Sequence, residues 1–327
     1  MSKNVKVSSA KMHDRASLAL VKGDLNTAEI WLEKALEENE RDATALAMLA
    51  NIYLKRDDTQ TALGLILLAI AEKPDELVHL EIFISCVSRM SFSFTAFNAS
   101  IANAVEVCLQ RDDVNVMRLG QLWHALLSCH PELADLADPG VSFESEKIAR
   151  LAVHPFFLAG LGQLMVQSRQ FETILVKLRA ALRDDLVSKT RRWTDEEFLR
   201  VAAALSHYNF FTEYILDTTP EEDIWVEEQR KKMTDVPQQA GAAVLALFSC
   251  YDSLGNIPDA SVLVDVFDGH AILKPVIDLQ IGEAIRQSKI KDRIPSATAI
   301  EDSVSGQVRD MYEAFPYPRW RYLPQNL

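Results

Sequence analysis

The side chains that most often carry out chemistry are widely scattered in this sequence. Its seven histidines show none of the spacings found at metal sites, and its four cysteines are far apart. Cys129 and His130 are adjacent, an arrangement that suits neither a shared metal nor a thiolate–imidazole pair on one helix. All the cysteines lie in apolar, helix-like runs, so we expect buried thiols rather than disulfides. They are Cys86, Cys108, Cys129 and Cys250.

No motif that would bind a phosphate, activate a serine or hold a catalytic zinc occurs in the sequence. Gly160-Leu161-Gly162 is the nearest approach to a glycine-rich loop, but it lies in an apolar helical stretch, where glycines favour close helix packing. The acidic pairs Glu196-Glu197 and Glu221-Glu222 follow Thr194 and Thr219 as in helix N-terminal capping boxes. We therefore expect these acids to begin helices, and we expect no active site in this chain.

The overall composition predicts a helical, globular chain. Of its 327 residues, 48% are hydrophobic and 25% are charged, as in ordinary folded proteins. The sequence has only 11 glycines and 12 prolines, with many Ala, Leu and Glu residues, which favours α-helix. No convincing run of alternating strand residues occurs. We therefore expect an all-α fold.

Net charge and hydropathy argue against a nucleic-acid partner, a membrane-spanning segment and a signal peptide. The formal net charge is −13, whereas a nucleic-acid binder needs a dense basic patch to neutralise phosphates, so we expect no nucleic-acid partner. The longest apolar window, residues 62–71, is too short to span a bilayer. No apolar segment follows the lysines near the N-terminus, as it would in a signal peptide. The sequence thus predicts a cytoplasmic protein with no membrane partner.

Small and aliphatic residues recur with a fixed spacing near the N-terminus. Ala16, Ala28, Leu32 and Ala35 reappear 34 residues later as Ala50, Ala62, Ile66 and Ala69. This pattern resembles the tetratricopeptide repeat, in which two antiparallel helices form each repeat of 34 residues. It predicts one hairpin from helices 11–21 and 26–38 and a second from helices 42–55 and 59–72. Alanines at the closest approach would bring the helix axes within about 8–10 Å.

Either a third, degenerate hairpin or a capping pair of helices is expected over residues 77–109. Leu80, Ile84 and Ala96 keep the repeat register, but Ser91-Phe92-Ser93-Phe94 interrupts it. After residue 110 the period is lost, although helical patterns persist. One of them predicts a helix over residues 116–129, and another predicts a helix over residues 238–253. The inward face of the first is expected to carry Leu119, Leu122, Trp123, Leu126 and Leu127. We therefore predict antiparallel helix hairpins of the tetratricopeptide type at 1–110, a larger irregular α-helical domain at 111–302, and a junction helix with a proline-rich aromatic segment at 303–327.

The junction is the most unusual stretch of the sequence. Apolar residues recur at three- and four-residue steps from Val304 to Phe315, which predicts one helical face. Pro316 and Pro318 then stop the helix, because proline lacks an N–H group and disfavours helical geometry in the residue before it. The aromatic segment that follows is expected to pack on another part of the protein.

This junction resembles a motif of a bacterial family in which a tetratricopeptide-repeat region and a helical segment precede a class I S-adenosylmethionine-dependent methyltransferase domain. The family pattern Val-Arg-x-x-Tyr-Glu-x-x-Pro-Tyr-Pro-Arg-Trp is matched at its nine defined positions between Val308 and Trp320. A second element, which starts at Asn209 and ends at Tyr214, is similar to the family's Cys-Phe-x-Asn-Glu-Tyr. There Asn209 and Thr212 depart from the pattern.

The resemblance implies that a methyltransferase domain would follow residue 327, so that the chain is the N-terminal part of a longer protein. S-adenosylmethionine would be the cofactor of that domain, with no cofactor held in this chain. Four junction residues would then lie at the mouth of the cofactor or substrate site; alternatively, they only anchor one domain to the next. These residues are Tyr312, Tyr317, Arg319 and Trp320.

Three functions are compatible with these observations. The first is a recognition module of a methyltransferase, which binds a protein or peptide in the repeat groove and presents it to the catalytic domain. The second is a stand-alone tetratricopeptide adaptor for protein–protein interaction, and the third is an enzyme with a site assembled from scattered residues. By repeat register, the candidate contacts in the groove are His13, Ser17, Asn51 and Lys55. The alternative is that these four side chains are ordinary solvated surface.

Overall fold

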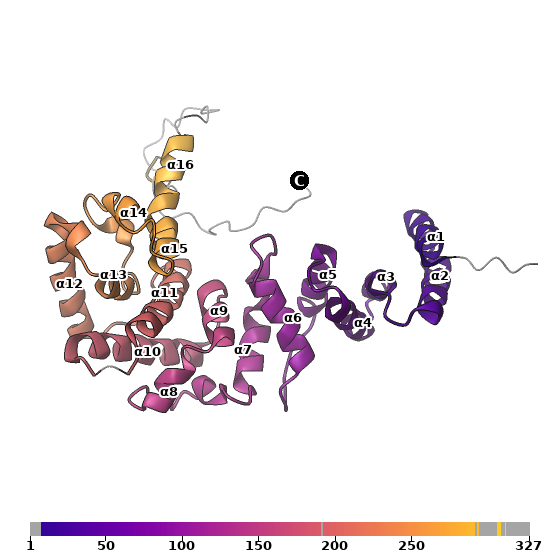
Figure 1. The fold of residues 1–327 in the computed structure, drawn as a ribbon, viewed down its shortest axis with the longest axis horizontal. Coiled ribbons are helices and arrows are strands. Elements are labelled where there is room, and N and C mark those ends of the chain that lie inside the picture. Colours follow the sequence, from indigo (N-terminus) through magenta and orange to yellow (C-terminus); the bar gives the residue numbers. More distant parts are fainter. Residues whose placement is uncertain (1–7, 191, 292, 294–305, 309–310, 312–327) are drawn as a thin grey trace, which may run out of the picture. The chain divides into compact units, whose positions relative to one another are not determined.

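The computed structural model describes residues 8–190, 192–291, 293, 306–308 and 311. Every regular element among these residues is a helix, which confirms the expected all-α fold. The chain divides into two compact units between Pro131 and Glu132; the first contains α1 to α7 and the second α8 to α16 (Figure 1). No helix in the described part of the chain is long and apolar enough to cross a bilayer.

The first unit begins with two helical hairpins whose limits repeat along the chain. Both α1 and α2 begin and end 34 residues before their counterparts, α3 and α4. All limits lie within two residues of those predicted from the sequence period. The four helices are α1 (Ser9–Val21), α2 (Leu25–Glu38), α3 (Ala43–Lys55) and α4 (Thr59–Glu72).

Small side chains let these helices pack closely. Ala16 in α1 and its equivalent Ala50 in α3 are completely buried, as are the two equivalent alanine pairs of α2 and α4. Larger aliphatic residues fill the space between the hairpins, because Leu32 of α2 and Ile52 of α3 belong to the same buried cluster. The residues that carry the sequence period are therefore core residues.

The turn inside each hairpin requires a residue in the left-handed conformation. Gly23 has a φ of 76°, and Asp57, at the equivalent position, has a φ of 61°. A side chain with a Cβ atom pays roughly 1–2 kcal/mol for this conformation, which aspartate tolerates better than most residues. The next residue of each turn caps the second helix: the carboxylates of Asp24 and Asp58 accept the N–H groups of Thr27 and Thr61.

A third hairpin occupies residues 77–109, as predicted. It consists of α5 (Leu77–Val87) and α6 (Ala99–Leu109), and α5 begins 34 residues after α3. Both helices pack against α4. This part of the chain therefore continues the arrangement of the first two hairpins.

The third hairpin differs from the others by an insertion between its helices. The buried positions of α4 recur in α6 after 39 residues instead of 34, so that Ile66 corresponds to Val105. Ala96, which the sequence placed in register, precedes α6 and is exposed, so its predicted place in the repeat is wrong. The insertion lies in the connection 88–98, where the rings of Phe92 and Phe94 stack with their centroids 5.7 Å apart.

A short 3-10 turn, η1 (Val116–Leu119), and α7 (Gly120–Ser128) complete the first unit. The helix predicted from residue 116 onward thus begins with a tighter turn. Its predicted inward face is confirmed, because every apolar residue expected there is buried: Leu119, Leu122, Trp123, Leu126 and Leu127. This face packs on α6 and η1, which is why the first compact unit continues to Pro131, whereas we placed the end of the repeat region at residue 110.

The second unit is built around α11, a 17-residue helix with ten buried residues. Helices α9, α10, α13 and α15 pack against it. The longer helices of this unit are α9 (Pro155–Gln163), α10 (Arg169–Ser188), α11 (Asp195–Phe211), α12 (Pro220–Asp235) and α16 (Glu283–Lys291). Shorter elements are η2 (Ala134–Ala137), α8 (Glu146–Leu151), η3 (Pro237–Gln239), α13 (Ala242–Phe248), η4 (Leu254–Asn256), α14 (Val262–Val266), α15 (Leu273–Ile277) and η5 (Asp278–Gly282).

Local sequence signals in this unit are realised closely. Capping boxes begin α11 and α12, with Thr194 paired to Glu197 and Thr219 paired to Glu222. Gly162 of α9 faces α11, but a Cβ atom there would lie 3.9 Å from the backbone of Ala204, an ordinary contact distance, so the packing does not itself require a glycine. The predicted helix over residues 238–253 is shorter than expected, because only Ala242–Phe248 is α-helical.

Candidate functional site

Of the four predicted groove residues, His13 is already engaged within the protein. Its Nε2 atom lies 3.0 Å from a carboxylate oxygen of Asp42 and 3.4 Å from the hydroxyl of Ser9. Asp42 is the N-cap of α3 and accepts the N–H group of Ala45 with its other oxygen. His13 therefore ties α1 to the start of α3, a role that accounts for its place in the fold.

Ser9, His13 and Asp42 have the residue types of a hydrolase triad but not its geometry. A serine nucleophile has to donate its proton to the imidazole, whereas the Ser9 hydroxyl donates to Asp42 at 2.6 Å. Burial raises the pKa of Asp42, but the bonds from Ser9, the Ala45 N–H group and His13 outweigh it and hold that pKa below its usual value. An ionised Asp42 that binds three donors stabilises the junction of the hairpins rather than activating a nucleophile.

The other three groove residues are available to a partner. Ser17 and Asn51 occupy equivalent positions on α1 and α3, and Lys55 follows one turn after Asn51. Ser17 and Lys55 are exposed and Asn51 is half-buried. None of their side chains has a hydrogen bond or ion pair within the part of the chain that the structure describes. The structure thus leaves polar groups unpaired at matching positions of consecutive hairpins.

A polar link between the hairpins was not expected from the sequence. The carboxylate of Glu29 in α2 accepts the hydroxyl of Tyr53 at 2.8 Å and lies 2.8 Å from the guanidinium of Arg56. Arg56 and Tyr53 lower the pKa of Glu29, so the carboxylate stays ionised. In the sequence, a large aromatic residue at position 53 indicates packing and gives no indication of this bond.

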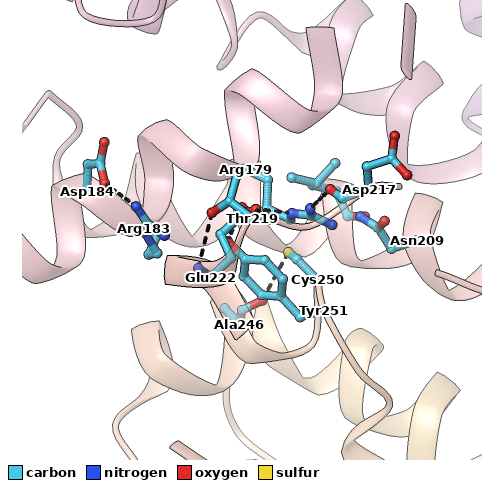
Figure 2. A network of polar contacts seen from close by, with 11 residues as sticks. Arg179, Arg183, Asp184, Asn209, Asp217, Thr219, Glu222, Ala246, Cys250 and Tyr251 are labelled. Atoms are coloured by element: carbon cyan, nitrogen blue, oxygen red, sulfur yellow. Dashed lines mark hydrogen bonds and ion pairs between the residues drawn. The ribbon is translucent and has the colours of Figure 1, made fainter. Parts of the chain in front are cut away.

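The second unit contains a buried polar network, shown in Figure 2. Arg179 of α10 and Glu222 of α12 form an ion pair with 3.3 Å between Nε and the carboxylate, and their side chains are 1% and 0% exposed. The guanidinium of Arg179 also donates to the backbone oxygen of Asp217, and its carbon atom lies 4.4 Å from the ring centroid of Tyr251. The network joins α10, α12 and the turn that contains Tyr251, which are distant in the sequence.

Glu222 is bonded on both sides of its carboxylate. One oxygen accepts the Tyr251 hydroxyl at 2.8 Å, and the other accepts the backbone N–H group of Thr219 as part of the capping box. Burial, and then the nearby Glu222 carboxylate, raises the pKa of Tyr251, so its hydroxyl remains a donor. The charged groups are buried and hydrogen-bonded to one another. The network therefore connects parts of the fold and does not form an open catalytic site.

The cysteine thiols are mostly buried, and the adjacent histidine contacts an aromatic ring. Cys86, Cys108 and Cys250 are buried and all four cysteines are free thiols. Burial raises the pKa of Cys129, and the ring of its neighbour His130 packs edge-on against Phe97 at 4.7 Å. Within the described residues, no group of three or more His, Cys, Asp or Glu side chains is arranged to hold a metal ion.

The predicted junction residues Tyr312, Tyr317, Arg319 and Trp320 lie outside the described residues. Of the junction helix, residues 306–308 and 311 are described, and they are helical. Comparisons with protein-family models, with curated proteins and with solved structures find no match for this chain.

Proposed function

We propose that this chain is a helical recognition module whose N-terminal hairpins bind a protein or peptide partner. The observation that carries the proposal is the register of the hairpins, which places the unpaired side chains of Ser17, Asn51 and Lys55 on the first helices of consecutive repeats. His13 is left out of this surface because it is bound to Asp42.

The chemistry of the surface favours a peptide that carries polar, apolar and acidic groups. The side-chain amide of Asn51 can donate and accept, as a peptide backbone does. Val21 occupies on α1 the position that Lys55 occupies on α3, and its side chain is 87% exposed. A partner with an apolar side chain and a carboxylate would match these two positions, because one offers apolar surface and the other an ammonium group.

The resemblance of the junction supports a further proposal, that the partner is presented to an S-adenosylmethionine-dependent methyltransferase domain. This proposal places the cofactor outside the chain. A calorimetric titration of the present chain with S-adenosylmethionine should therefore show no binding. Tight binding would overturn the assignment of the cofactor to another domain without affecting the repeat surface.

Recognition by the hairpins can be tested by selecting peptides from a random display library on the native protein. The selected peptides are then offered to N51A/K55A and to a control variant, Q60A/K73A, which removes an amide and an ammonium group from exposed positions of α4 and its C-cap. We expect the peptides to be retained by the control and lost by N51A/K55A. Equal retention by both variants would exclude this surface.

A further inference from the structure

The outer face of the first hairpin differs in chemistry from the equivalent face of the second. On the second hairpin, Ala45, Leu49 and Ile52 of α3 are buried in the cluster shared with the first hairpin. Leu65 of α4 packs against the same cluster. This face is therefore the one through which a hairpin receives the hairpin that precedes it.

The corresponding positions of the first hairpin, 34 residues earlier, are Lys11, Arg15, Leu18 and Trp31. Lys11 and Arg15 are exposed, and the Leu18 side chain is 61% exposed. Two cations thus stand where the second hairpin has a buried alanine and a buried leucine. The apolar character of the face survives only at Leu18 and Trp31.

Two cations also cover the indole ring of Trp31. The guanidinium carbon of Arg15 lies 4.3 Å from the ring centroid, and the ammonium nitrogen of Lys34 lies 4.7 Å from it. Both distances are within the range of cation–π attraction, which holds a charge over an aromatic face while the charge remains in contact with water. The exposed aromatic surface is therefore occupied by side chains of the same hairpin.

A further hairpin could pack on this face only by removing Lys11 and Arg15 from water. Neither side chain has an ion pair within the described residues that would compensate for the loss of hydration. Burying an unpaired charge costs several kcal/mol, more than the burial of one leucine returns. Lys11 and Arg15, which occupy the positions of Ala45 and Leu49, therefore oppose the stacking of a further hairpin on the outer face of the first hairpin.

We propose that Arg15 and Lys34, which lie over Trp31, form together with the exposed Lys11 a cationic cap that closes the outer face of the first hairpin against stacking by another helical hairpin, including that of a second copy of this chain. Arrays of repeats need such an adapted terminal face, because an apolar one would associate with its like. The cap directs partners to other surfaces of the unit.

The test converts the cap into the stacking face of the next hairpin. The variant K11A/R15L introduces the residues found at positions 45 and 49, and both suit a helix, so α1 is retained. The control K73A/R118L makes the same two substitutions at exposed positions away from this face. Sedimentation velocity over a range of concentrations compares both variants with the native chain, and L18E is added to the first variant to restore charge to the face.

We expect the apparent mass of K11A/R15L to rise with protein concentration towards twice the mass of the native chain. This is the result expected when the same face of two copies pairs with itself. The control should sediment as the native chain does, and the added L18E should abolish the gain. An unchanged mass for K11A/R15L would overturn the proposal. So would an association that L18E does not reverse, because it would not involve this face.

Discussion

The buried network of Arg179, Glu222 and Tyr251 allows a stability prediction whose size follows from the structure. Replacing Glu222 by Gln leaves the Arg179 guanidinium in a fully buried position without its counter-ion. Replacing Arg179 by Met leaves the Glu222 carboxylate buried in the same way and removes the donor to the Asp217 backbone oxygen. Breaking a buried ion pair from one side costs about 3–5 kcal/mol, because the remaining charge cannot regain water.

The double variant R179M/E222Q should cost much less than the sum of the two single changes. It leaves no unpaired buried charge, and the amide oxygen of Gln can still accept the Thr219 N–H group or the Tyr251 hydroxyl. We expect each single variant to lose about 4 kcal/mol, the double variant to lose about 5 kcal/mol, and the coupling energy to be about 3 kcal/mol.

Urea unfolding followed by far-ultraviolet circular dichroism measures these free energies, and the melting temperature provides a second reading. For a unit of this size each kcal/mol shifts the melting temperature by about 2–4 °C, so each single variant should melt roughly 8–16 °C lower. The surface pair formed by Arg200 and Glu196, 2.6 Å apart and more than half exposed, is the matched control. R200M and E196Q should change stability far less, because exposed pairs contribute little. Losses below about 1 kcal/mol for the buried single variants, or strict additivity, would refute the reasoning.

Three further predictions concern the first unit. Gly23→Ala should lower the free energy of unfolding by about 1–2 kcal/mol, because Gly23 has a φ of 76°. Gly64→Ala should raise the free energy of unfolding by about 0.5–1 kcal/mol, because Gly64 lies in the interior of α4 with open space around the new Cβ. A lower melting temperature for Gly64→Ala than for Gly23→Ala would contradict this prediction. Asp42 has a lowered pKa in the folded protein. The stability that it contributes should therefore be complete above its unfolded pKa of about 3.9 and should fall as the pH drops through the folded pKa. In urea titrations between pH 6 and about 2.5, the free energy of unfolding should depend less on pH for D42N than for the native chain, and an equal dependence would count against the hydrogen bonds to Asp42. Burial raises the pKa of Cys86 to about 11 and that of Cys108 to about 12, so a disulfide reagent at pH 8 should modify these two thiols only after denaturant is added. Peptide mapping distinguishes them from the partly buried Cys129, and rapid labelling of Cys86 or Cys108 in the native chain would contradict this prediction.

The hairpins of the first unit were predictable because their signal is local and periodic. The spacing of alanines such as Ala16 and Ala50 fixes which helix faces meet, and the limits of all four helices follow from it. The capping boxes of α11 and α12 were predictable for the same reason, since their residues are three positions apart. The five-residue insertion of the third hairpin was not, because a connection has no period to read.

The buried network and the engagement of His13 could not be predicted, because they depend on residues that only the fold brings together. Glu222 was visible as the acid of a capping box, but its partners Arg179 and Tyr251 lie 43 and 29 residues away. His13 was placed in the groove by register alone, whereas its contact with Asp42 depends on the fold, which brings the N-cap of α3 next to α1. The unpaired state of Asn51 likewise became apparent only when all neighbouring contacts were known.

The most direct test of the proposed recognition surface is a calorimetric titration of the native protein, S17A, N51A/K55A and Q60A/K73A with one peptide selected on the native chain. The proposal predicts a dissociation constant that rises about tenfold or more for N51A/K55A, since the loss of two polar contacts is worth about 1.5–3 kcal/mol. S17A should bind more weakly by a smaller factor, and Q60A/K73A should bind as the native protein does. A constant that is the same for all four proteins would contradict recognition through the first helices of the hairpins.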